Sequence, residues 1–93
     1  MGKYLVELYV PSSSPEALTS AVARARTAAS EMALDGMHVT YLRSLFLPGD
    51  ELCFLLYEGS SAEVVGEAAR RAAITFERIV EADTADGVDP DSS

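Results

Sequence analysis

Charged side chains interrupt apolar segments of this chain that otherwise have the composition of buried strands. Glu7 lies in the segment 3–10, Arg43 in "VTYLRSLFL", Glu58 at the end of "CFLLYE", and Arg78 in "FERIVEA". An unpaired charge in an apolar core costs several kcal/mol. We therefore expect these four side chains to share a surface that avoids the core.

Such a surface has the side chains needed to bind a small organic molecule. A binding site for one is a mostly apolar concave surface with a few well-placed polar groups. The candidate ligand-binding residues are Glu7, Tyr9, Tyr41, Arg43, Glu58 and Arg78. In the alternative interpretation these charges only pair with one another, Arg43 or Arg78 with Glu7 or Glu58, and hold two subunits together.

The same residues also permit a catalytic hypothesis, a cofactor-free oxygenase or isomerase. Glu7 or Glu58, desolvated by neighbouring tyrosine and leucine side chains, would have a raised pKa and act as a general base. Arg43 would then hold an anionic substrate or a developing enolate. No histidine is available on this surface for proton transfer, which favours a non-catalytic binding protein.

The sequence predicts neither a metal site nor a cofactor. His38 is the only histidine and Cys53 the only cysteine, and they are far apart in the sequence. Nickel and zinc prefer several imidazole or thiolate ligands that converge on one point. Cys53 lies within an apolar run, which is typical of a buried structural thiol.

The elements that must position these residues follow from hydrophobic periodicity. Strands are expected at about 3–10, 37–47, 51–58 and 76–82, with a turn at Pro48-Gly49-Asp50. A helix from about Pro15 to Asp35-Gly36 and a second helix after Ser60 complete the series. One face of the first helix carries Leu18, Val22, Ala25, Ala29 and Met32.

This order of elements predicts a ferredoxin-like βαββαβ sandwich, an α+β fold with a four-stranded antiparallel sheet and both helices on one face. Alternation in 3–10 assigns Tyr4, Val6, Leu8 and Val10 to the core. The other face of the sheet would carry Leu5, Glu7 and Tyr9 from this strand, and Tyr41, Arg43 and Leu45 from the next.

The open face is too apolar for us to expect it to remain exposed to water. We predict that it meets the same face of a second subunit across a two-fold axis, as in proteins of the dimeric α/β-barrel type. The proposed cleft between the paired sheets is where a small molecule would bind.

Composition limits the other partners. The net charge of −8 and the scattered Lys and Arg residues argue against nucleic acid. No apolar stretch is long enough to span a bilayer, and the N-terminus does not look like a secretory signal, so we expect a cytoplasmic protein without a membrane partner. One domain is expected at 1–82, followed by an acidic tail at 83–93 whose composition is typical of disorder.

Several segments together resemble the small ferredoxin-like proteins catalogued as domain of unknown function 4242. They are "YLVELYVPSSSPEAL", "YLRS", "CFLLYEGSSAEVV" and "GEAARRAAITFERI". The resemblance implies a homodimer that packs sheet against sheet, and some members of the family bind nickel. The family's histidine in the second helix corresponds here to Ala68, and the first helix has no histidine either, so the implied nickel site lacks its ligands.

Overall fold

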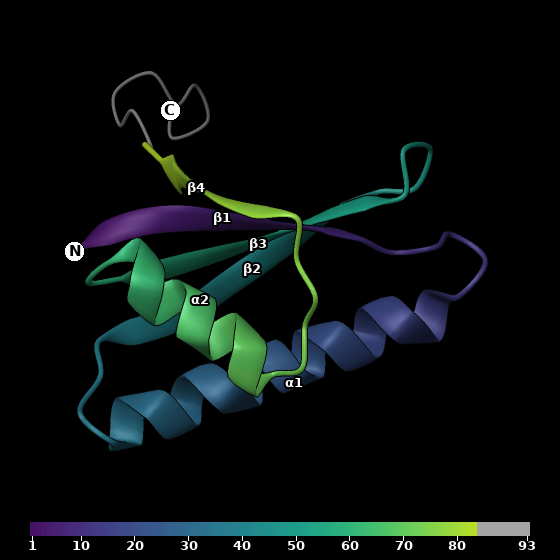
Figure 1. Ribbon diagram of the computed structural model, residues 1–93. Helices are drawn as coiled ribbons and strands as arrows, with labels where there is room; N and C mark the ends of the chain where they lie inside the picture. Colours follow the sequence, from purple (N-terminus) through teal and green to yellow (C-terminus); the bar gives the residue numbers. More distant parts are fainter. Residues whose placement is uncertain (84–93) are drawn as a thin grey trace, which may run out of the picture.

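The computed structural model describes residues 1–83, and the predicted tail at 83–93 lies outside this part from residue 84 onward. The elements are β1 (Gly2–Tyr9), α1 (Pro15–Leu34), β2 (Val39–Leu47), β3 (Leu52–Gly59), α2 (Ala62–Arg71) and β4 (Arg78–Ala82). The strands form one sheet in the order β2-β3-β1-β4, and every neighbouring pair is antiparallel. Figure 1 shows both helices against the same face of this sheet. The predicted ferredoxin-like fold is confirmed.

The core lies between this sheet face and the helices. Val6, Leu8 and Val10 are buried as alternation predicted, and Cys53 is fully buried in β3. From α1, small side chains such as Ala25 and Ala29 are buried, which allows the helix to approach the sheet closely. No helix within residues 1–83 is long and apolar enough to cross a bilayer.

A β-bulge in β2 changes which of its side chains face the helices. Tyr41 pairs with Tyr57 of β3, but the next pair is Arg43 with Leu56, so that Leu42 is an extra residue. Tyr41 therefore packs against the core, with its ring 5.7 Å from that of Tyr57 in an edge-on arrangement. The prediction that Tyr41 shares the open face with Arg43 is wrong, because it assumed unbroken alternation along β2.

Both helices end in the same hydrogen-bonded pattern. After α1, Gly36 N–H donates to the Ala33 carbonyl and Met37 N–H to that of Met32. After α2, Ala73 N–H donates to Arg70 and Ile74 N–H to Ala69. These are the paired bonds of a Schellman motif, whose central position requires a positive φ and is usually glycine. Gly36 has φ 89°, whereas Ala73 adopts φ 58° with a side chain.

Replacing Ala73 by glycine is expected to stabilise the fold. An L-residue in the left-handed region costs about 1–2 kcal/mol, which glycine would relieve. The greater freedom of glycine in the unfolded chain offsets about 0.4–1 kcal/mol of this gain in stability. In urea unfolding, the free energy of unfolding of Ala73→Gly should therefore be about 0.5–1 kcal/mol higher than that of the unchanged protein. The control Ala23→Gly, in the exposed middle of α1, should lose about 1 kcal/mol, and a loss at both positions would contradict the strain at Ala73.

Tyr57 is the largest fully buried side chain, and within the described residues its hydroxyl has no hydrogen-bond partner. Burial, with a smaller contribution from Tyr41, raises the pKa of the Tyr57 phenol. A buried hydroxyl without a partner costs about 1–3 kcal/mol. The aromatic ring, and not the hydroxyl, is therefore what stabilises the core at this position.

We expect Tyr57→Phe to leave the free energy of unfolding unchanged or to raise it by up to about 1 kcal/mol. Thermal and urea unfolding would measure this change. A loss of more than about 1 kcal/mol would instead mean that a buried water satisfies the hydroxyl.

Candidate functional site

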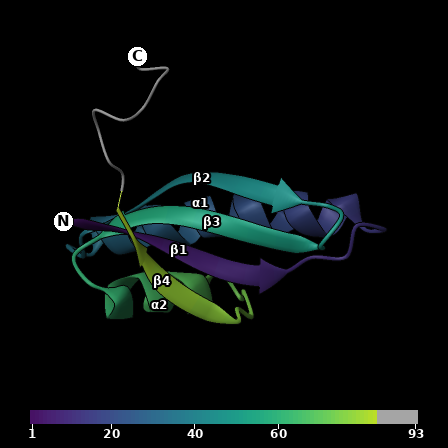
Figure 2. The same ribbon diagram turned by 90° about the horizontal axis from the view of Figure 1, so that it is seen from above.

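The face of the sheet opposite the helices is the candidate site. Figure 2 shows it from above, with the four strands in front and both helices behind them. The pairing of the strands places eight large apolar side chains on this open face: Leu5, Tyr9, Leu45, Leu47, Leu52, Phe54, Leu56 and Val80. Tyr9 and Leu45 are 56% and 60% exposed. Leu47 is also exposed, and the other five are partly exposed. A contiguous apolar surface of this kind is typical of an interaction site.

Five of the six predicted ligand-binding residues lie on this face: Glu7, Tyr9, Arg43, Glu58 and Arg78. Glu7 accepts a hydrogen bond from Arg78 Nε at 2.7 Å, and the Glu7 side chain is only 16% exposed. Lys3 Nζ lies 3.8 Å from a Glu58 carboxylate oxygen. Both acidic residues are therefore already paired with a cation inside the subunit.

Arg43 differs from these paired residues because no ion pair involves it among residues 1–83. It lies beside a hollow of about 450 Å³ that is lined by Leu5, Arg43, Ser44, Leu45, Phe54 and Leu56. Neither Glu7 nor Glu58 lines this hollow. The lining of the hollow is thus mostly apolar, with Arg43 as its one charged residue.

Much of the open face is made up of β3 side chains that the sequence reasoning did not assign: Leu52, Phe54 and Leu56. Glu58 was expected on the open face, and counting back from it in steps of two reaches all three. Alternation in β3 could therefore have identified them. The role of Lys3 depends on the register between β1 and β3, which alternation alone does not determine.

Tyr9 lies on the open face but at its far end, where its hydroxyl makes a specific contact. The Tyr9 hydroxyl donates to a Glu51 carboxylate oxygen at 2.6 Å, and the other oxygen accepts from the Ser12 N–H at 2.8 Å and the Ser12 hydroxyl at 3.0 Å. These hydrogen bonds lower the pKa of Glu51, and the one from Tyr9 has the largest effect. In turn, the Glu51 carboxylate raises the pKa of Tyr9. The cluster joins the β2–β3 hairpin to the segment that leads into α1.

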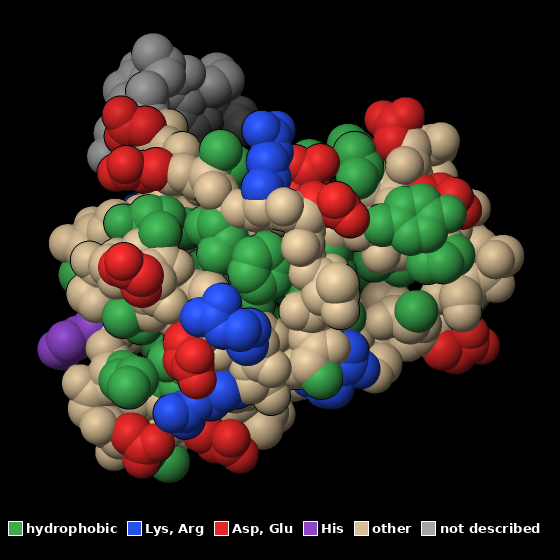
Figure 3. Space-filling model, in the orientation of Figure 1, with side chains coloured by type: hydrophobic (Ala, Val, Ile, Leu, Met, Phe, Trp, Pro, Cys, Tyr) green, Lys and Arg blue, Asp and Glu red, His purple; other side chains and the backbone are tan. Residues whose placement is uncertain are grey.

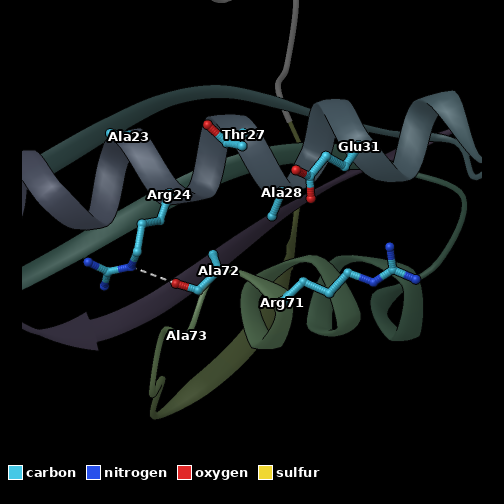
Figure 4. Close-up of a pocket in the computed structure, with 8 residues that line it drawn as sticks. All are labelled: Ala23, Arg24, Thr27, Ala28, Glu31, Arg71, Ala72 and Ala73. Atoms are coloured by element: carbon cyan, nitrogen blue, oxygen red, sulfur yellow. Dashed lines mark hydrogen bonds between the residues drawn. The ribbon is translucent and has the colours of Figure 1, made fainter.

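A second hollow, of about 370 Å³, lies between α1 and the end of α2. Figure 4 shows Arg24 reaching from α1 to the Ala72 carbonyl, with Nε 2.7 Å from that oxygen. Arg71, at the other end of the hollow, pairs with Asp35 and Glu67. Figure 3 shows basic and acidic side chains next to one another over α2. The two arginines of this hollow are thus engaged in joining the helices.

Within residues 1–83, no group of three or more His, Cys, Asp or Glu side chains is arranged to hold a metal ion. His38 is exposed, whereas Cys53 is buried in β3. Burial raises the pKa of the Cys53 thiol. The imidazole and the thiol are therefore in different environments.

Comparison with known proteins supports the fold. The crystal structure of SCO4226 from Streptomyces coelicolor A3(2) superposes with a TM-score of 0.73 over 89% of this chain and 98% of that chain, at 18% sequence identity. At this identity the likeness shows the fold alone. No family model matches the chain, and no curated protein does. The resemblance to domain of unknown function 4242 therefore stays a prediction.

The Glu51 cluster predicts a specific loss of stability in acid. The pKa of Glu51 in the folded state lies below its ordinary value of 4.5, so the contribution of Glu51 to the stability of the fold is fully present above that pH. It is lost as the pH falls below 4.5 through the folded-state pKa. Glu51→Gln should lower the melting temperature at pH 7 and make the curve of melting temperature against pH flatter below 4.5.

The matched control is Asp50→Asn, which removes the same charge from the neighbouring exposed residue. It should leave the acid part of the curve as steep as in the unchanged protein. Equal flattening by both substitutions would show that overall charge, and not the Tyr9–Glu51–Ser12 cluster, determines the acid response.

Proposed function

We propose that this chain is a small non-catalytic binding protein that works as a homodimer, with the open faces of two subunits together enclosing a ligand. The observation that carries the proposal is the apolar open face with a hollow of about 450 Å³ beside Arg43. A second copy of the chain is the partner that we infer, because an apolar face is complementary to itself across a two-fold axis.

The charges on the open face are compatible with burial against a second copy. Isolated charges are costly to desolvate, whereas charges with a hydrogen-bonded partner are less so. Glu7 is paired with Arg78 and Glu58 with Lys3 within one subunit. Only Arg43 of the charged residues on this face in residues 1–83 would enter the interface without an ion-pair partner of its own.

The size of the sheet also suits such an interface. Strands about 4.8 Å apart, with β1, β2 and β3 of eight, nine and eight residues and β4 of five, cover roughly 480 Å² in projection. The accessible area is larger because the side chains protrude. It approaches the lower end of the roughly 600–1,000 Å² that each partner contributes to a stable interface.

The catalytic alternative, a cofactor-free oxygenase or isomerase, has less support. It requires a desolvated carboxylate facing the substrate, but Glu7 and Glu58 are each paired with a cation and lie outside the lining of the hollow. The nickel-binding alternative depends on the family resemblance, and Ala68, at the position of the family's histidine, is fully buried. We therefore favour binding without catalysis.

A charge at Leu45 should dissociate the dimer. Leu45→Glu, on the open face in the edge strand β2, is expected to raise the dimer dissociation constant at least about tenfold, since it places an unpaired carboxylate in an apolar interface. Light scattering over a range of micromolar concentrations would measure it. Leu45→Lys should have the same effect. Because Arg43 would attract the glutamate but repel the lysine, a similar loss with both variants would show that the cost is the desolvation of the new charge.

The matched control is Leu34→Glu, because Leu34 is also an exposed leucine, 87% exposed at the end of α1, on the helix side of the molecule. This variant should remain dimeric. Thermal unfolding would confirm that all three variants are folded. A monomeric unchanged protein at these concentrations would refute the proposed dimer.

A further inference from the structure

Arg43 is positioned so that its charge has no acidic neighbour across the strands. Its partner on β3 is Leu56, while Glu58 lies opposite Thr40, on the other side of the bulge. Glu58 is in turn close to Lys3. Although Glu58 lies only two residues from Leu56 on the same face, no ion pair joins it to Arg43 within residues 1–83.

The hollow that Arg43 lines is mostly apolar. Leu5, Leu45, Phe54 and Leu56 supply most of the lining of the hollow, and Arg43 is the charged residue in that lining. A guanidinium presents several N–H groups in a plane and binds a carboxylate through two parallel hydrogen bonds. In a hollow that a second subunit closes, an unpaired guanidinium would be costly, so the site requires an anion.

The number of cations limits which anion fits. A phosphate monoester carries up to two charges and three acceptor oxygens, and such groups are usually held by several donors. Here one guanidinium faces an apolar surface, in a chain whose net charge of −8 repels multiply charged anions. A single negative charge attached to an apolar body matches this lining better.

We propose that the hollow binds a small organic carboxylate, whose carboxylate group pairs with Arg43 and whose apolar body lies against Leu5, Phe54 and Leu56. The volume of about 450 Å³ is within the range of small-molecule sites. This inference rests on the proposed function, because the second subunit would exclude water from the pair. It adds the chemical class of the ligand.

The test uses three probes of nearly equal shape: 4-phenylbutyrate, 4-phenylbutyramide and 4-phenylbutylamine. Calorimetric titration of the full chain should show the carboxylate binding at least about tenfold more tightly than the amide, with the amine weakest. Arg43→Gln should abolish the preference for the carboxylate, and Arg43→Lys should keep part of it. The control Arg70→Gln removes the same charge from the exposed side of α2 and should leave the preference unchanged.

Light scattering on each variant separates the failure of this inference from failure of the dimer. A dimer that does not prefer the carboxylate, or that keeps its preference in Arg43→Gln, would overturn the inference and leave the dimer standing. A third outcome is that Arg43→Gln becomes monomeric and that no probe binds the unchanged protein at about 1 mM. This would mean that a carboxylate of the second copy pairs with Arg43, and it would also overturn the inference. A monomer whose carboxylate preference depends on Arg43 would support the inference and refute the proposed dimer.

Discussion

The bulge at Leu42 is the constraint on which the two faces of the sheet depend. Side chains alternate along a strand with a period of two, so one extra residue exchanges the faces for everything beyond it. A regular β2 with Tyr41 in the core would turn Arg43 and Leu45 toward the helices as well. The extra residue lets one strand bury Tyr41 and still direct Arg43 outward.

Contacts on both sides of the sheet follow from this arrangement. On the helix side, the rings of Tyr41 and Tyr57 form a T-shaped pair, and the guanidinium carbon of Arg26 lies 5.4 Å from the centroid of the Tyr41 ring. This cation–π contact links α1 to the edge of the sheet. On the open side, the same bulge brings Arg43 and Leu45 to the hollow. Tyr41 therefore contributes to stability, and Arg43 has no ion-pair partner within residues 1–83.

Local pattern was enough to predict the fold and much of the open face. Unbroken alternation in β1 placed Val6 and Leu8 in the core and Glu7 outside, and the structure agrees. Tyr41 was misplaced because nothing in the local composition marks Leu42 as a bulge residue. The pairing of Lys3 with Glu58 depends on contacts 55 residues apart, which periodicity does not encode.

The bulge has a further consequence because β2 is an edge strand. An exposed edge presents unpaired N–H and C=O groups that can recruit a strand from another chain, the first step toward an extended β-aggregate. The irregularity between Tyr41 and Arg43 breaks the even row of these groups, since a regular incoming strand cannot follow it in register. At the opposite edge, β4 has only five residues. The protein can thus keep an apolar sheet face, as the proposed dimer requires, while its edges resist uncontrolled polymerisation.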